Sequence, residues 1–116
     1  METWEARFGR AFYVSERGET AIAEIGSHGK NATHVIRYRL NLAEAKVLDL
    51  TDPALVKIWG SPAGEHYEIT KAIAFRARAA GYDAIRFPSL RGPGNNFAIF
   101  DNFDRILKPQ MVVPAR

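Results

Sequence analysis

The sequence predicts an α+β fold with short helices and a sheet that is mixed or mostly antiparallel. Segments rich in aromatic and β-branched residues outnumber segments with helical spacing. The two kinds of segment do not alternate strictly, which disfavours a doubly wound sheet. A length of 116 residues suffices for one hydrophobic core and is too short for two independent ones. We therefore expect a single domain over residues 1–116.

The first elements are a strand and a helix. Ala11–Ser15 (AFYVS) is predicted as a strand from its aromatic and β-branched content. Thr20–Ile25 begins like a helix, because Thr20 can cap the first free amides and Gly26 can end it.

The middle of the chain predicts two strands and a short helix. Residues 34–40 (HVIRYRL) favour a strand, and residues 46–50 (KVLDL) are expected to be its neighbour in the sheet. Asp52 and Pro53 form a helix entry, since aspartate caps the first turn and proline fits within it. A helix over residues 54–59 and a loop over residues 60–64 follow.

The clearest helix is predicted over residues 67–80, with Gly81 placed for a left-handed C-cap. Its apolar spacing predicts a buried stripe of Ile69, Ala72, Ile73 and Ala77. Residues 83–87 (DAIRF) are predicted as a strand ending at Pro88, and residues 90–96 (LRGPGNN) as a glycine-rich loop.

Two strands are expected to close the chain. Residues 97–100 (FAIF) are predicted as a buried strand. Residues 105–113 are predicted as the last strand, and Pro109 within it confines that strand to an edge or a bulge.

Composition is that of a folded globular chain, with 47% apolar and 25% charged residues. Sixteen basic residues against thirteen acidic ones are scattered along the chain, which is weak support for nucleic-acid binding. The absence of cysteine excludes disulfides and thiolate metal sites. No run of about 18 apolar residues and no signal-peptide pattern is present. The spacing of the three histidines gives no metal motif, and no P-loop or Rossmann glycine pattern occurs.

Two segments could carry polar groups to one cleft. Tyr13 and Ser15 end a strand, and Glu24 follows on a largely apolar helix, where a carboxylate is paired, exposed or held at a functional site. Periodicity alone leaves open that Glu24 lies on the solvent side of that helix.

Phosphate-binding groups are the next candidates. Ser89 leads into a loop whose glycines and Arg91 suit a phosphate cradle, although an ordinary surface turn has the same composition. Arg7 and Arg10 precede the Tyr13 strand and could bind phosphate as bidentate partners or be surface charges.

Together these blocks resemble the RES family, named after an Arg-Glu-Ser set, over Arg7 to about Pro109. The similar segments are residues 11–15 (AFYVS) followed by residues 20–24 (TAIAE), residues 47–52 (VLDLTD), residues 68–73 (EITKAI), and residues 87–89 (FPS) with residues 96–100 (NFAIF). The family's Gly-Gly-Arg-Trp-Asn block is replaced here by Arg7-Phe-Gly-Arg10, which makes Arg7 the better match to its arginine.

The resemblance implies an ADP-ribosyltransferase-like fold, a split mixed sheet with NAD⁺ in its central cleft. It implies catalytic roles for Tyr13, Glu24, Ser89 and Arg7, with Ser15, Arg10, Arg91 and Asn96 or Asn95 binding the dinucleotide. NAD⁺ is then the substrate, and no metal is expected.

The activity implied is cleavage of the nicotinamide–ribose bond by an NAD⁺ phosphorylase or glycohydrolase acting as a toxin. Mono-ADP-ribosyl transfer to a protein or RNA is the first alternative, and a non-catalytic binding or immunity protein is the second. The family occurs in toxin–antitoxin pairs and in polymorphic toxins. A cognate antitoxin or immunity protein is thus expected as a partner, no membrane is involved, and the site of action is the cytoplasm, reached in one setting as part of a secreted bacterial effector.

Overall fold

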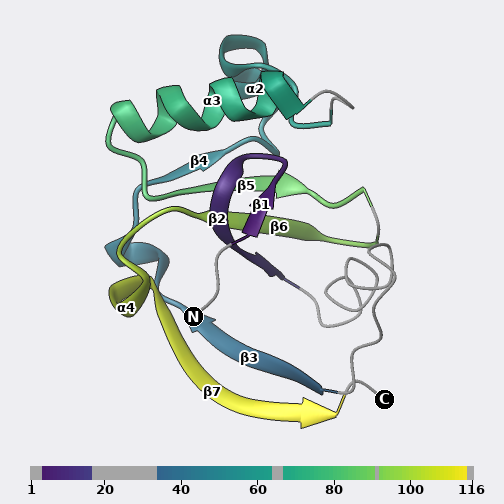
Figure 1. The fold of residues 1–116 in the computed structure, drawn as a ribbon, viewed down its shortest axis with the longest axis vertical. Helices are drawn as coiled ribbons and strands as arrows, with labels where there is room; N and C mark the ends of the chain where they lie inside the picture. Colours follow the sequence, from purple (N-terminus) through teal and green to yellow (C-terminus); the bar gives the residue numbers. More distant parts are fainter. Residues whose placement is uncertain (1–3, 17–33, 64–66, 91, 115–116) are drawn as a thin grey trace.

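A computed structural model describes residues 4–16, 34–63, 67–90 and 92–114. The chain forms three layers, with helices above a five-stranded sheet and a two-stranded sheet below it (Figure 1). The elements in order are β1 (Trp4–Ala6), β2 (Gly9–Ser15), β3 (His34–Leu40), η1 (Leu42–Glu44), β4 (Val47–Asp49), α2 (Pro53–Trp59), α3 (Tyr67–Ala79), β5 (Ala84–Pro88), β6 (Asn95–Ile99), α4 (Phe103–Ile106) and β7 (Leu107–Pro114).

The five-stranded sheet has the order β1-β2-β6-β5-β4. Its pairs are antiparallel except for β4 with β5, which are parallel and joined through α2 and α3. A parallel pair needs such a crossover, because the chain must return to the same end of the sheet. The predicted α+β class with a mixed, split sheet is confirmed.

The expected pairing of residues 34–40 with residues 46–50 is wrong. β3 pairs with β7 along its whole length, from His34 opposite Pro114 to Leu40 opposite Leu107. This pairing turns Tyr38, Leu40 and Leu107 toward the large sheet, where they join a buried cluster. Pro109 lies in this two-stranded sheet, next to a register shift between Arg37 and Tyr38. Its predicted place at an edge or bulge is confirmed.

Helix α2 begins as the sequence predicts. The Asp52 side chain accepts a hydrogen bond of 2.9 Å from the Ala54 amide, and Pro53 opens the helix. Helix α3 also ends as predicted, since Gly81 follows it with a φ of 87°, which favours glycine.

The predicted buried stripe of α3 is half wrong. Thr70, Ile73, Ala74 and Ala77 are buried, whereas Ala72 is exposed and Ile69 is 53% exposed. Thr70 turns inward because its hydroxyl donates to the main-chain carbonyls of Arg7 and Tyr67. Apolar spacing alone could not anticipate that a threonine would anchor a distant turn.

The C-terminal elements differ from the prediction at two boundaries. β6 begins at Asn95 instead of residue 97, because Asn95 and Asn96 continue the ladder opposite Pro88 and Phe87. The last strand begins at Leu107 instead of residue 105, since α4 occupies Phe103–Ile106.

Two apolar cores lie on the two faces of the large sheet. The first fills the space under α2 and α3 and contains Phe8, Leu48, Ile73, Ile85 and Ala98 among others. The second lies between the sheet and the β3–β7 and α4 layer and includes Phe97, Ile99, Ile106 and Leu107. The same strands contribute side chains to both cores, because successive side chains along a strand point to opposite faces of the sheet.

Candidate functional site

Polar residues gather at one end of the large sheet, which we call the polar end and define as Ser15, Glu16, Ser89, Asn95 and Asn96. Ser15 lies opposite Asn96 in the ladder, and the Glu16 amide donates to the Asn95 carbonyl at 2.9 Å. Ser89 follows the last residue of β5, and its amide donates to the Gly94 carbonyl at 3.1 Å. Three separated segments therefore meet there.

The α3 face of the sheet carries three of the predicted site residues, two of them at the polar end. Tyr13 packs against the first core, and alternation places Ser15 on the same face two residues later. Asn96, opposite Ser15, is only 6% exposed. A buried amide and a hydroxyl thus lie side by side on one face.

The Tyr13 hydroxyl binds the turn between β1 and β2. It accepts a hydrogen bond of 3.0 Å from the Phe8 amide and donates one of 2.7 Å to the Gly9 carbonyl. Phe8 in turn packs its ring 4.8 Å from that of Phe87. Tyr13 therefore fixes the turn that carries Arg7.

Arg7 lies against the start of α3. Its Nη1 donates to the Pro62 carbonyl at 3.2 Å, and its guanidinium lies 5.4 Å from the centre of the Tyr67 ring. Helix α3 runs back across the sheet in the direction opposite to β5, so its first turn lies over the Pro88 end of that strand (Figure 1). Arg7 is thus on the same side of the molecule as the polar end.

Ser89 precedes the glycine-rich loop and also forms hydrogen bonds to residues within it. Its Oγ accepts a hydrogen bond of 3.2 Å from the Gly92 amide. Gly94 has a φ of 84°, a conformation that a side chain would disfavour. The loop therefore has a defined entry and exit at the polar end, whereas Arg91 within it lies outside the described residues.

Two other predicted residues are not placed at the polar end. Arg10 lies at the opposite end of β2, where its carbonyl accepts from Arg78 Nη2 at 3.1 Å. Glu24 lies outside the residues that the structure describes.

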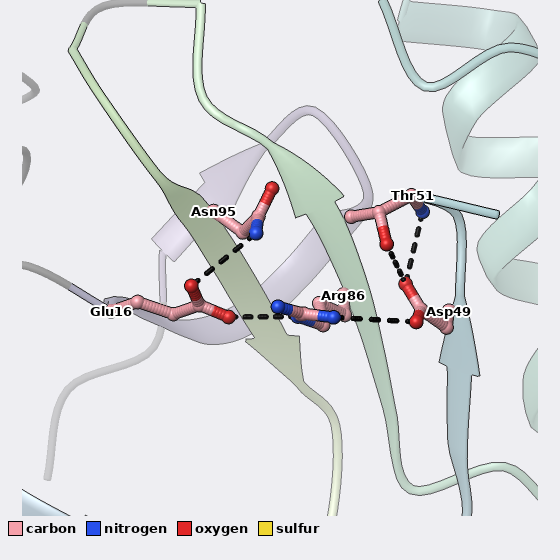
Figure 2. Close-up of polar contacts among 5 residues, drawn as sticks. All are labelled: Glu16, Asp49, Thr51, Arg86 and Asn95. Atoms are coloured by element: carbon pink, nitrogen blue, oxygen red, sulfur yellow. Dashed lines mark hydrogen bonds and ion pairs between the residues drawn. The ribbon is translucent and has the colours of Figure 1, made fainter.

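A charged network covers the other face of the sheet at the polar end (Figure 2). Arg86 of β5 donates through Nε to Glu16 Oε1 at 2.7 Å and through Nη1 to Asp49 Oδ2 at 3.3 Å. The second Glu16 oxygen accepts from Asn95 Nδ2 at 3.3 Å. The second Asp49 oxygen accepts from the Thr51 amide at 3.0 Å and from its hydroxyl at 2.5 Å.

These contacts shift two pKa values. For Asp49, partial burial raises the pKa, but hydrogen bonds from Thr51 and the charge of Arg86 outweigh burial and lower it below its usual value. For Arg86, the hydrogen bond to Glu16 outweighs desolvation and raises the pKa further. Both shifts favour the charged forms of Asp49 and Arg86.

Sequence reasoning missed Glu16, Asp49, Thr51 and Arg86. The sequence did contain a signal for these charges. Arg86 is the one charged residue in the apolar run Ala84–Phe87, and Asp49 is the one charged residue in the apolar run of residues 47–50. What one sequence does not show is that β4 and β5 are neighbours in register, with Asp49 opposite Arg86.

In the described ranges, no three His, Asp or Glu side chains lie close enough together to hold a metal ion. The same part of the chain contains no helix long and apolar enough to cross a membrane.

The split sheet with α3 across one face defines the class of fold, and comparison with solved structures gives it a counterpart. The chain is similar to a chain in the crystal structure of the M. tuberculosis MbcT–MbcA toxin–antitoxin complex, with a TM-score of 0.75 at 15% identity, over 94% of this chain and 70% of that one. A model of the RES domain family matches residues 3–114, so this chain belongs to that family. A search of curated proteins returned no match.

Proposed function

We propose that this protein is a toxin that cleaves the nicotinamide–ribose bond of NAD⁺. One observation supports this best. The fold brings Ser15 of β2 to the same end of the sheet as Ser89 and Asn96, which lie far along the chain, and Tyr13 lies on the same face of β2. The turn that carries Arg7 is bound by the Tyr13 hydroxyl. These residues match the set that the family resemblance assigns to dinucleotide binding and catalysis.

The chemistry requires a stabilised cation. As the bond from ribose C1 to nicotinamide nitrogen breaks, its electron pair leaves with nicotinamide and the ribose gains oxocarbenium character. A carboxylate stabilises that charge, and Glu24 is our candidate. Phosphate or water then attacks C1, which gives ADP-ribose 1″-phosphate, or ADP-ribose and a proton.

The other residues have binding roles in this proposal. Arg7, Arg91 and the Ser89 loop hold the pyrophosphate, because arginine and backbone amides suit phosphate oxygens. Ser15 and Asn96 hold the ribose hydroxyls. Asn95 has no such role in this proposal, because its side chain faces the opposite side of the sheet and donates to Glu16. Tyr13 contacts the nicotinamide ribose from the position where it also supports the Arg7 turn.

The direct test is nicotinamide release from NAD⁺ by the purified protein, measured with and without phosphate. The Glu24→Ala variant is expected to lower kcat by about 100-fold or more, as loss of an electrostatic stabiliser does. Glu44→Ala, on an exposed turn far from the polar end, is the matched control and keeps wild-type activity. No nicotinamide release by the wild-type protein would contradict the proposal.

The same experiment with NAD⁺ labelled in its adenylate half separates the alternatives. Label on protein or RNA indicates ADP-ribosyl transfer, and label in small molecules indicates degradation. Binding of NAD⁺ without any turnover indicates a non-catalytic protein.

We further propose a cognate antitoxin as partner and the cytoplasm as the site of action. The structural neighbour was solved as a toxin–antitoxin complex. Expression without a partner is expected to deplete cellular NAD⁺ and arrest growth, and harmless expression at high level counts against a toxin.

A further inference from the structure

The Arg86 network extends across most of the width of the large sheet. Arg86 on β5 reaches over β6 to Glu16 beyond Ser15 of β2, and in the other direction to Asp49 on β4. Asn95 ties β6 to the same Glu16 carboxylate. The network thus joins segments from four strands through side chains alone, and its guanidinium bonds Glu16 and Asp49 directly (Figure 2).

The network lies directly behind the candidate site. Glu16 and Asn95 face the side opposite α3, and their chain neighbours Ser15 and Asn96 face the α3 side. The backbone contact from the Glu16 amide to the Asn95 carbonyl continues the ladder after the Ser15–Asn96 pair. The residues that the network holds are therefore direct chain neighbours of Ser15 and Asn96 in the same ladder.

Stability alone does not explain these charges. The side chains of Arg86, Glu16 and Asp49 are 33%, 28% and 39% exposed. Ion pairs this exposed add little to the free energy of folding. The arginine geometry is nonetheless specific, since Nε and Nη1 bind two different carboxylates and a lysine ammonium cannot reproduce that fork.

We propose that Arg86 is a positioning residue, which holds Glu16 and Asn95 on one face of the sheet and thereby fixes Ser15 and Asn96 on the other. This inference rests on the proposed function for its catalytic consequence. It assigns Arg86 no contact with substrate, because both of its bridging nitrogens are used by Glu16 and Asp49.

The first test compares Arg86→Met with Arg39→Met, which removes an exposed strand arginine from the smaller sheet. Arg86→Met is expected to lower kcat for nicotinamide release at least about tenfold, since small misplacements of reacting groups cost this much. Its KM changes less than kcat, and its melting temperature falls by no more than about 5 °C. Arg39→Met leaves all three values unchanged.

Two further readouts separate positioning from simple support of the fold. Arg86→Lys is expected to recover only part of kcat, because one ammonium cannot bridge both carboxylates. Millimolar methylguanidinium is expected to raise the activity of Arg86→Ala and not that of Arg39→Ala. Equal kcat in Arg86→Met and wild type, or a loss that matches only the unfolded fraction, overturns the proposal.

A third readout does not depend on NAD⁺ cleavage. Hydrogen exchange at the Glu16 amide, which donates to Asn95, and NMR shifts of Ser15 and Asn96 report the polar end directly. Arg86→Met is expected to speed this exchange and move these resonances, whereas unchanged values overturn the inference. If the wild-type protein cleaves no NAD⁺, the proposed function fails, and this measurement still decides the role of Arg86.

Discussion

The two ends of the five-stranded sheet are built from the same strands but carry different kinds of side chain. At one end, Phe12, Ile99, Ala84 and Val47 face the second core in neighbouring register positions, and we call this set the apolar end. At the polar end, Glu16 and Asn95 occupy the corresponding face of β2 and β6. Alternation continues along each strand while the residue type changes from apolar to polar.

This difference separates folding from chemistry. Burial of aliphatic side chains at the apolar end supplies free energy, because removing apolar surface from water is the main favourable contribution to folding. The Arg86 network at the polar end consists of partly exposed charges, which contribute little to stability. Changes at the two ends should therefore affect different measurements.

The largest effect on stability is expected at the apolar end. Ile99→Ala removes a side chain that is 1% exposed and leaves a cavity, which lowers the free energy of unfolding by about 2–5 kcal/mol. Urea denaturation measures this loss, and nicotinamide release per folded molecule should remain at the wild-type level. Ile69→Ala, at an exposed position on α3, is the control and changes stability by less than about 0.5 kcal/mol. Similar losses in both variants would break the comparison.

An intermediate effect is expected at Tyr13, which lies between the two ends. Tyr13→Phe removes the hydroxyl that binds the Phe8 amide and the Gly9 carbonyl, which costs about 1–3 kcal/mol because the partners lose their hydrogen bonds. Activity per folded molecule also falls, since this turn carries Arg7. Thermal and urea unfolding with matched activity assays measure both. An unfolding free energy equal to that of the wild type would show that the hydroxyl does not hold the turn.

The smallest effect on stability is expected at Asp49. Its pKa is lowered in the folded state, so its contribution is complete above the pKa of unfolded aspartate, about 3.9, and is lost as the pH falls through the folded pKa. Asp49→Asn should cost at most about 1 kcal/mol at pH 7, a value reduced by solvent exposure. Urea denaturation at pH 7 and at several lower pH values tests the sign, because the difference from the wild type should shrink as the pH falls through the folded pKa of Asp49. A difference that does not change with pH would assign it to packing.

Much of the fold could be predicted from the sequence, and the reason is that the signals are local. Asp52 and Pro53 begin α2 with contacts to residues next to them, and Gly81 ends α3 through its own backbone conformation. The strand at Ala11–Ser15 follows from the shape of its own side chains. The prediction of the buried stripe on α3 was partly wrong, because the Thr70 hydroxyl donates a hydrogen bond to the carbonyl of Arg7, 63 residues away.

The candidate site divides in the same way. Tyr13, Ser15, Ser89 and Asn96 could be predicted as site residues from the sequence, because their residue types suit the chemistry and their segments resemble the RES family. Glu24 and Arg91 remain predictions. Arg86 and its carboxylate partners were not predicted, because each is an ordinary charge until the strands are placed beside one another.

By itself, the sequence determined most of the helices and strands, their order, the family and the residue types available for chemistry, since each depends on neighbours along the chain. The short elements β1, η1 and α4 were not predicted. Only the tertiary structure decided that β3 pairs with β7, that Arg10 lies away from Ser15, and that Arg86 joins Glu16 to Asp49. Those outcomes depend on which strands bury their apolar faces together. That choice is made by the free energy of the whole core and is not encoded in any single segment.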